Sequence, residues 1–174
     1  MAVAVPARIA YPYTAMVRIR GTTDLLLNRW RAERNNESGD YEACVYRTKT
    51  GELGIPGSYL RGAILEAAGF YGPLADVFRS GIACLPDVAS LRKRTWDYLD
   101  RRRVRVKGRS ITRTRPAMKA GWEAEFEVLV TDPVHIVPPL LQAVIEKAGM
   151  IAGLGDFRPV FGRFEVVKFE VVGE

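Results

Sequence analysis

The stretch from Gly54 to Ala68 reads "GIPGSYLRGAILEAA" and combines a chain turn with the start of a helix. Pro56 fixes the backbone, Gly57 lets it bend, and Ser58 is a favourable N-cap residue. Apolar side chains then recur on one helical face: Leu60, Ile64, Ala67, Ala68 and Tyr71. The pair Gly72-Pro73 is a helix-stop signal. The sequence therefore predicts an amphipathic helix that begins at Ser58.

The start of this predicted helix has two interpretations. A helix N-terminus carries free N–H groups and a partial positive charge, and both favour a phosphate. Ser58 adds a hydroxyl at this end, and Arg61 lies one turn into the helix. The alternative is a capped core helix that binds no ligand. The stretch is not a Walker-type nucleotide loop, because it lacks the Gly-Lys-Ser/Thr that such a loop requires.

The sequence before the helix predicts a strand followed by a long loop. Residues 13–21, "YTAMVRIRG", alternate two sets of side chains, which is typical of a strand with one buried face. Residues 28–40 are polar, have no period and contain many turn formers, so we expect a loop. A short hairpin that turns at Thr50-Gly51 follows, and residues 28–54 together form the long loop of the predicted domain.

Downstream, two strands and one helix have clear patterns. Residues 122–130, "WEAEFEVLV", alternate apolar side chains with glutamates and predict a strand. Residues 138–149, "PPLLQAVIEKAG", predict a helix that opens on two prolines and closes at Gly149. A final strand follows a glycine-rich loop. Between Leu74 and Leu91 the pattern is weak, and we expect a short helix and a loop there.

Residues 101–121 alternate valine with arginine and then arginine with threonine, as a strand or an extended ribbon does. The pair Lys107-Gly108 is suited to a hairpin turn. With this ribbon taken as the second strand, the element order is β-α-β-β-α-β, which is the ferredoxin-like arrangement of an α+β protein. We therefore predict a single domain over residues 1–174, with a basic insertion at residues 74–120.

Positive charge is concentrated in one part of the chain. The net charge is +6, but residues 92–119 carry +10 and the rest of the chain carries −4. Such a block next to a mildly acidic body indicates a polyanionic partner. Trp96, Tyr98 and Trp122 are interleaved with it and suit base stacking, although Trp122 fits the core face of its strand better. The alternative is an edge strand whose arginines prevent pairing with other chains.

The segment "GLGDFRPVFGRF" brings three glycines and two arginines together just before the final strand. A dinucleotide fingerprint places its glycines between a strand and a following helix, so nicotinamide binding is not supported. The glycines allow a close approach of the backbone to a ligand, with Arg158 and Arg163 next to it. A tight helix-to-strand connection explains them equally well.

The composition excludes several kinds of chemistry. Cys44, Cys84 and His135 do not form a zinc motif, and one histidine cannot build a Ser/His/Asp set of catalytic residues. Two buried thiols are the simpler interpretation of the cysteines, with a disulfide as the alternative. No apolar run reaches the roughly 18 residues of a membrane span, so we expect a cytoplasmic protein with no membrane partner. Asp24 and Asp40 flank the polar stretch of the long loop. An exposed loop aspartate is usually only solvated, and the alternative is that it helps cleave RNA by positioning the 2′-hydroxyl or a metal-bound water.

Two of these motifs resemble one known family. "IPGSYLRGAI" resembles the Ile-Pro-Gly-Ser-Ser-Leu-Lys-Gly signature of the RAMP superfamily, the repeat-associated proteins of CRISPR effector complexes. "GLGDFRPVFGRFEV" is similar to the glycine-rich loop that precedes the last strand in that superfamily. The resemblance extends from the first strand to the last, and it implies an RNA-recognition-like core with RNA held across the sheet. The basic insertion takes the place of the thumb that projects onto RNA or onto a neighbouring subunit.

The resemblance also implies partners and roles for residues. It implies a backbone subunit that polymerises along single-stranded guide RNA, with target RNA, copies of itself in a helical filament and other CRISPR subunits as partners. Asp40 lies fifteen residues ahead of Ile55, as the target-cutting aspartate does in that family, so it carries the cleavage role, with Mg²⁺ as cofactor if it is catalytic. The implied RNA-binding residues are Ser58, Arg61, Arg101, Arg102, Arg103, Arg105, Lys107, Arg109, Arg113, Arg115, Gly153, Gly155, Arg158 and Arg163.

Departures from the family pattern keep other functions open. Tyr59 replaces the second serine of the signature, Arg61 replaces its lysine, and the chain is short for a backbone subunit. One alternative is a stand-alone or phage-borne relative that binds single-stranded nucleic acid without cutting it, or that inhibits a CRISPR complex. A second is a ribonuclease that acts alone. A third is a structural or assembly protein with a basic arm.

Overall fold

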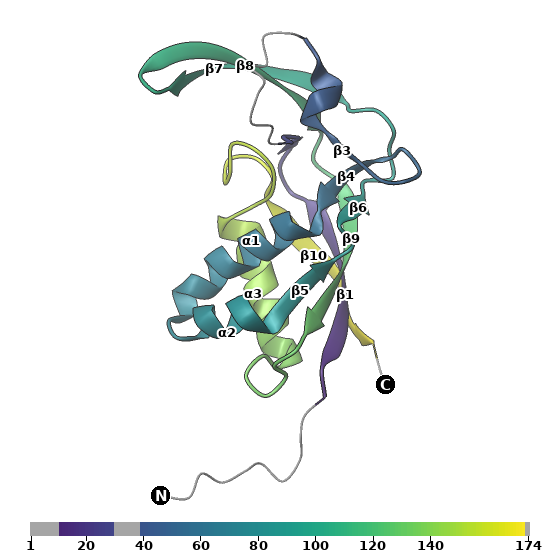
Figure 1. Ribbon diagram of the computed structural model, residues 1–174, viewed down its shortest axis with the longest axis vertical. Helices are drawn as coiled ribbons and strands as arrows, with labels where there is room; N and C mark the ends of the chain where they lie inside the picture. Colours follow the sequence, from purple (N-terminus) through teal and green to yellow (C-terminus); the bar gives the residue numbers. More distant parts are fainter. Residues whose placement is uncertain (1–10, 30–38, 173–174) are drawn as a thin grey trace, which may run out of the picture.

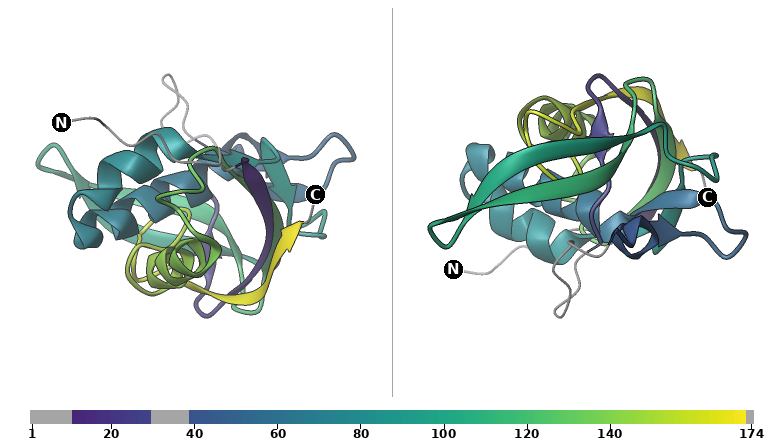
Figure 2. Two further views of the ribbon diagram at one scale, coloured as in Figure 1. Left: turned by 90° about the horizontal axis from the view of Figure 1, so that it is seen from below. Right: turned by 90° about the horizontal axis from the view of Figure 1, so that it is seen from above.

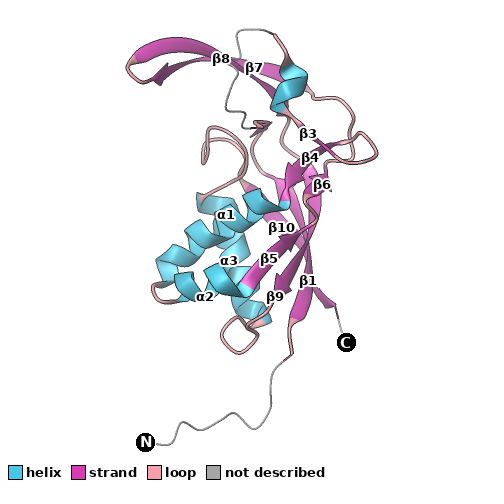
Figure 3. Ribbon diagram, viewed as in Figure 1, coloured by secondary structure: helices cyan, strands magenta, loops and turns pink. Residues whose placement is uncertain are grey.

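The structure is a computed structural model that describes residues 11–29 and 39–172. It is an α+β protein whose body contains a sheet with helices packed against one side, and a long two-stranded ribbon projects from one end (Figure 1). The helices lie together on that side of the sheet, while the opposite side of the sheet is open (Figure 3). The fold class agrees with the α+β prediction.

The central sheet has four antiparallel strands in the order β10-β1-β9-β5. The strands are β1 (Tyr13–Gly21), β5 (Ile82–Leu85), β9 (Glu123–Val130) and β10 (Phe164–Val172). In β1 the alternate residues Ala15, Val17 and Ile19 are fully buried, which confirms the predicted alternation. Sequence alternation defines β1 and β9 because one sheet face packs against helices and the other does not.

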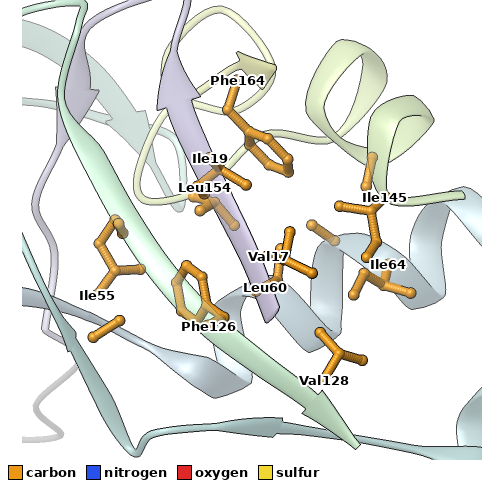
Figure 4. Packing of buried hydrophobic residues seen from close by; sticks show 14 of the residues in the cluster. Val17, Ile19, Ile55, Leu60, Ile64, Phe126, Val128, Ile145, Leu154 and Phe164 are labelled. Carbon is orange, nitrogen blue, oxygen red and sulfur yellow. The ribbon is translucent and has the colours of Figure 1, made fainter. Parts of the chain in front are cut away.

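The helices are α1 (Gly57–Ala68), α2 (Leu74–Gly81) and α3 (Pro138–Ile151). Short 3₁₀ turns, η2 (Tyr41–Cys44) and η3 (Gly69–Tyr71), complete the helical elements of the described residues. Figure 4 shows how Leu60 and Ile64 of α1 and Ile145 of α3 meet Val17, Ile19 and Phe126 of the sheet. All six side chains are fully buried, so the predicted apolar faces of both long helices form the core.

Helix α3 extends beyond Gly149, where the sequence predicted its end. Gly149 has a packing role instead, because a Cβ at this position would lie 2.1 Å from the carbonyl oxygen of Phe164 in β10. Only a residue without a side chain allows the helix to approach the strand so closely.

The basic ribbon consists of β7 (Tyr98–Val106) and β8 (Arg109–Met118). Together with the short β2 (Leu25–Leu26) they form a second sheet in the order β2-β8-β7. Lys107 and Gly108 both have positive φ values, 49° and 79°, as a type I′ hairpin turn requires, so the predicted hairpin is confirmed. Seen along the long axis of the molecule, the ribbon crosses over the end of the body (Figure 2).

A third small sheet has the order β3-β4-β6, with β3 (Tyr46–Arg47), β4 (Leu53–Pro56) and β6 (Val88–Ser90). Strands β3 and β4 form the hairpin predicted at Thr50-Gly51, and Gly51 has a φ of 88°. Residues 41–44, which the sequence assigned to this hairpin, form the 3₁₀ turn η2 instead.

Two predictions about the core elements are wrong. The second strand of the central sheet is β5, not the basic ribbon, so the predicted insertion at residues 74–120 begins with α2 and β5 of the body. The ribbon cannot replace β5 because arginines and threonines occupy its faces, whereas Ile82–Leu85 is apolar and pairs with β9. In addition, Pro56 is the N-cap residue of α1 and makes no side-chain capping hydrogen bond, and Ser58 is the second helical residue.

Candidate nucleic-acid interface

The two faces of the ribbon differ in what their arginines contact. Residues directly opposite in an antiparallel pair share a face, and Arg101, Arg103 and Arg105 lie opposite Thr114, Thr112 and Ser110. The three arginines are exposed. This face, which we call the outer face, thus carries a row of guanidinium groups flanked by hydroxyls. Lys107 and Arg109 are also exposed, at the tip of the ribbon.

On the opposite face, which we call the inner face, Arg102 is held by three partners. Its guanidinium donates hydrogen bonds of 2.6 and 2.7 Å to the carboxylate of Asp100. It also lies over the rings of Phe157 and Phe161, at 4.9 and 4.5 Å from their centroids. The hydrogen bonds to Asp100 raise the pKa of Arg102. Because of these contacts, Arg102 attaches the ribbon to the loop that contains both phenylalanines.

Two further arginines of the inner face contact the same loop. Arg115 donates a 3.0 Å hydrogen bond to the carboxylate of Asp156, and Arg113 lies 3.6 Å from the same carboxylate oxygen. Arg115 is only 5% exposed. The sequence implied that Arg102, Arg113 and Arg115 contact RNA, but in the structure their guanidinium groups join the ribbon to the glycine-rich loop.

The glycine-rich loop, residues 153–163, needs its glycines for its own conformation. Gly153, Gly155 and Gly162 have φ values of 72°, 78° and 77°. A Cβ at Gly162 would lie 1.7 Å from the carbonyl oxygen of Leu154, and one at Gly155 would lie 2.4 Å from that of Leu26. The loop is therefore a tight connection between α3 and β10, as one of the two sequence interpretations expected.

The same loop also forms one wall of an open groove of ≈ 290 Å³. Helix α1 forms the other wall, and the lining includes Ser58, Gly62, Glu66, Gly153, Gly155 and Arg158. The structure thus brings Ser58 together with Gly153, Gly155 and Arg158, although almost a hundred residues separate them in the sequence. Arg158 donates a 3.2 Å hydrogen bond to Glu66 across the groove, so an ion pair already occupies its rim.

Arg61 and Arg163 are the two candidate arginines that lie neither on the ribbon nor in the lining of this groove. Arg61 donates hydrogen bonds to the carbonyl oxygens of Ile82, at 3.3 Å, and of Arg79, so it joins α1 to α2 and β5. Arg163 is exposed just before β10, and its backbone bonds Thr22 and Thr23. The helix start therefore offers the groove a hydroxyl from Ser58 rather than a cation from Arg61.

The open face of the central sheet is a poor surface for phosphates. Glutamates of β9 and β10 lie on it, and they pair with arginines of β1: Arg18 lies 2.9 Å from Glu125, and Arg20 lies 2.9 Å from Glu123. Glu127 is exposed on the same face. Carboxylates repel phosphates, and the arginines are already engaged. The family resemblance implied RNA across the sheet, but these charges favour the ribbon and the groove instead.

The two aspartates that flank the long loop are in different environments. Asp24 accepts hydrogen bonds from the hydroxyl of Tyr98 at 2.6 Å and from the backbone N–H of Ala120 at 2.8 Å. It therefore supports the base of the ribbon. Asp40 is exposed, and its carboxylate accepts a 3.3 Å hydrogen bond from the N–H of Ala43 as the N-cap of η2. Residues 30–38 of the long loop lie outside the described residues.

Tyr59, which departs from the family signature, has a structural role. Its hydroxyl donates a 2.6 Å hydrogen bond to the carbonyl oxygen of Asn28, and its ring packs edge-on against Tyr46. Burial raises the pKa of this phenol. Tyr59 thus ties the start of the long loop to α1, a contact that no feature of the sequence indicated.

The candidate metal ligands and the two cysteines lie apart in the described ranges 11–29 and 39–172. These ranges contain no cluster of three or more histidine, cysteine or acidic side chains able to hold a metal ion. His135 pairs with Asp132 at 2.9 Å, and no disulfide joins Cys44 to Cys84. Within the same ranges, none of the helices has the length and apolarity needed to cross a bilayer.

Sequence reasoning missed the residues that attach the ribbon to the loop. Asp156, Phe157 and Phe161 all lie in the glycine-rich segment, but the sequence predicted ligand contacts only for its glycines and arginines. The signal available in the sequence was two aromatic residues in a short polar loop, since exposed aromatic side chains are costly unless something covers them.

Comparison with known proteins supports the fold. No family model and no curated protein sequence matches the chain. Among solved structures, a chain of "Cryo-EM structure of the Type III-B Cmr-beta bound to cognate target RNA" is similar, with a TM-score of 0.57 and 16% sequence identity. The match covers 93% of this chain and 61% of that chain, so this protein spans less than two thirds of the solved chain. A likeness at this identity shows a shared fold.

Proposed function

We propose that this chain is an RNA-binding subunit of a CRISPR-type ribonucleoprotein, with a ferredoxin-like core of the RAMP kind. The strand order β10-β1-β9-β5 and the element order β-α-β-β-α-β of that sheet support the ferredoxin-like part. The Ile-Pro-Gly-Ser stretch at the start of α1 lies next to the glycine-rich loop, as the family signature implies. The similar solved chain belongs to a structure with bound target RNA.

The row formed by Arg101, Arg103 and Arg105 on the outer face is the observation that carries this proposal. Their direct neighbours across the ribbon are hydroxyl residues rather than carboxylates, so the guanidinium groups are available to an anion. Regular spacing along an extended ribbon suits the repeating phosphates of a single strand better than a compact ligand. Phosphate contacts carry no sequence information, so the protein itself has little sequence preference.

The groove between α1 and the glycine-rich loop provides the second contact. It lies next to the loop that the inner face of the ribbon contacts, so one strand of RNA is able to reach both surfaces. Ser58 offers a hydroxyl, and Arg158 offers a guanidinium at the rim. In an assembly with guide RNA, base pairing would read the target while this subunit holds the backbone.

The decisive experiment compares two triple variants of equal charge. In the first, Arg101, Arg103 and Arg105 become alanine. In the control, Arg79 on α2, Lys147 on α3 and Lys168 on β10 become alanine. Each phosphate contact on a single strand contributes about 0.7 to the slope of log affinity against log salt, so the first variant should flatten the slope by about 2. If both variants weaken RNA binding equally, net charge alone explains the effect and the proposal is wrong.

Assembly of copies along RNA is part of the same proposal. The expected result is that purified protein carries single-stranded RNA and forms particles of graded length, which size-exclusion chromatography with absorbance at two wavelengths would detect. A structural or assembly protein would instead form oligomers after nuclease treatment. Sequencing the RNA that co-purifies would show which RNA the protein binds.

We also propose Asp40 as the residue on which any cutting of bound RNA depends. Its carboxylate is exposed next to the long loop, and η2, which it caps, packs against β8 of the ribbon sheet. The described residues contain no group of three or more acidic, histidine or cysteine side chains around Asp40 that could hold Mg²⁺. Asparagine caps helices as well as aspartate does, so Asp40→Asn keeps the cap and removes the charge. Cleavage by the Asp40→Asn protein at the wild-type rate would leave Asp40 only its capping role.

A further inference from the structure

We propose that Arg102 is a positioning residue that fixes the ribbon over the glycine-rich loop, so that the outer arginine face and the groove engage one RNA strand together. The inference rests on the proposed function, because it concerns how two RNA-binding surfaces are held at a fixed distance. One turn of the glycine-rich loop serves both surfaces. Its Phe157 and Phe161 contact Arg102 of the ribbon, and its Arg158 lies at the rim of the groove.

The contacts of Arg102 are those of a fixed side chain. Asp100 accepts two hydrogen bonds from its guanidinium, which also lies over the rings of Phe157 and Phe161. The planar guanidinium fork suits this arrangement, and a lysine ammonium offers neither the fork nor the flat surface for stacking. The Arg102 side chain is still 33% exposed, but its guanidinium is committed to Asp100 and the two rings, so it is better placed to hold the ribbon than to bind a phosphate.

The loop is built to present these rings. Phe157 has a φ of 55°, a conformation that a bulky residue adopts only under constraint, and the N–H of Phe161 bonds the carbonyl of Phe157 at 3.0 Å. The two rings meet edge to face with centroids 6.5 Å apart. Arg158 lies between them in sequence and reaches Glu66 at the groove. Movement of this turn would therefore displace the ribbon contact and the groove wall at the same time.

The loop also lies between the ribbon and α1 in space (Figure 1). The base of the ribbon has separate attachments, namely Arg115 to Asp156 and Tyr98 to Asp24. Because these attachments remain when Arg102 is changed, loss of Arg102 should free the part of the ribbon between Arg102 and the tip without unfolding the protein. Because the base of the ribbon stays attached without Arg102, a positioning role of Arg102 can be distinguished from a role in folding.

A fixed spacing has a measurable consequence for RNA of different lengths. When two sites are held rigidly, a strand long enough to reach both binds more tightly than a short one, because the second contact is intramolecular. Loosening the ribbon lowers that effective concentration. The affinity for long RNA then falls, whereas the affinity for RNA that reaches only one site stays the same.

The test uses Arg102→Lys, which keeps the positive charge, alongside Arg102→Ala and the double variant Phe157→Ala/Phe161→Ala. Affinity is measured for oligouridylate from a few to a few tens of nucleotides. We expect all three proteins to lose about tenfold or more in affinity for the long strands and to bind the shortest strands as the wild type does. Backbone amide hydrogen exchange should become faster between Arg102 and the tip of the ribbon and stay unchanged in β1 and β9.

Three kinds of result separate the failure of this inference from that of the proposed function. Arg102→Lys protein that binds long RNA as tightly as the wild type, or that loses affinity equally at every length, overturns the positioning role alone. Unchanged exchange in the ribbon of the Arg102→Ala protein overturns it as well. Wild-type protein that binds oligouridylate of no length overturns the proposed function and this inference with it.

Discussion

Arg115 of the ribbon donates a 3.0 Å hydrogen bond to Asp156 of the glycine-rich loop, and Arg115 is only 5% exposed. A charge removed from water in this way is tolerated only when it is paired and hydrogen-bonded. Asp156 also accepts a hydrogen bond from the N–H of Phe157 and lies near Arg113. Its carboxylate therefore joins the ribbon to the body at the point where the ribbon begins to project.

Asp156→Ala should be strongly destabilising. It removes an acceptor from the buried Arg115 charge, and breaking a buried pair from one side costs about 3–5 kcal/mol in the free energy of unfolding. Urea unfolding followed by circular dichroism measures the change. The matched control is Asp76→Ala, which removes an exposed carboxylate 3.8 Å from Arg79 and should cost less than about 1 kcal/mol. Equal losses in the two variants would show that Asp156 does not stabilise Arg115.

Much of the fold was predictable because periodic burial leaves a pattern in the sequence. In β9 the alternation of Phe126 and Val128 with glutamates reflects one face against helices and one face in water. The turn at Lys107-Gly108 was predictable because type I′ geometry requires positive φ at both positions. Strand β5 was missed because four residues are too few to show a period.

The candidate interface was less predictable, because it depends on which segments meet. Alternation places Arg101 and Arg102 on opposite faces of the ribbon, but nothing in the sequence tells which face meets the loop. Asp156 and Arg115 are 41 residues apart and share no motif. The glutamates of β9 alternate with its buried residues, so they lie on the open face of the sheet and make it acidic. The family resemblance nevertheless implied RNA on that face. Contacts between segments far apart in the sequence therefore decide which arginines hold the ribbon and which are exposed, and composition alone does not show this.

Gly149 and Gly62 should respond oppositely to alanine. Both are helical, and alanine is favoured over glycine in a helix interior by about 1 kcal/mol. At Gly149 the new Cβ would lie 2.1 Å from the carbonyl oxygen of Phe164, so Gly149→Ala should lower the free energy of unfolding by several kcal/mol. At Gly62 the new Cβ would have no atom of the described residues within 4 Å apart from its chain neighbours and the adjacent backbone of the same helix, so Gly62→Ala should raise the free energy of unfolding by up to about 1 kcal/mol. Thermal unfolding of both proteins would decide, and a stabilised Gly149→Ala protein would contradict the packing.

The thiol of Cys84 should be unreactive in the folded protein. Burial raises its pKa to about 12, with Arg61 acting weakly in the opposite direction. The reactive species is the thiolate, which the unfolded chain forms near its ordinary pKa of about 8.5. In a Cys44→Ala background, a thiol reagent at pH 8 should therefore label the folded protein far more slowly than the urea-unfolded protein.

The same shift makes stability depend on pH. The pKa of Cys84 is raised on folding, so its contribution is fully present below about pH 8.5 and is lost as the pH rises towards 12. The wild type should lose more free energy of unfolding between pH 7 and pH 10 than the Cys84→Ala variant does. Parallel losses in the two proteins would mean that the thiol ionises with the same pKa in the folded and unfolded chains.

Glu66 should weaken RNA binding in the wild-type protein, so that its removal increases affinity. Its carboxylate lines the groove and holds Arg158 at 3.2 Å, where it repels phosphates and occupies a cation that would otherwise meet them. Because both side chains are about half exposed, the ion pair contributes little to folding, and Glu66→Ala should change the free energy of unfolding by less than about 1 kcal/mol. We expect RNA affinity to rise about fivefold, which corresponds to about 1 kcal/mol.

Two companion variants identify the cause of that rise. Glu66→Gln keeps the size of the side chain and removes its charge, so it should give most of the gain if repulsion is responsible. Glu146→Ala removes an exposed carboxylate from α3, where its partner is Gln142 and the groove is not involved. Filter binding with one RNA at low salt would rank the three proteins. A loss of affinity in the Glu66→Gln protein would instead mean that Glu66 holds Arg158 in the orientation that RNA requires.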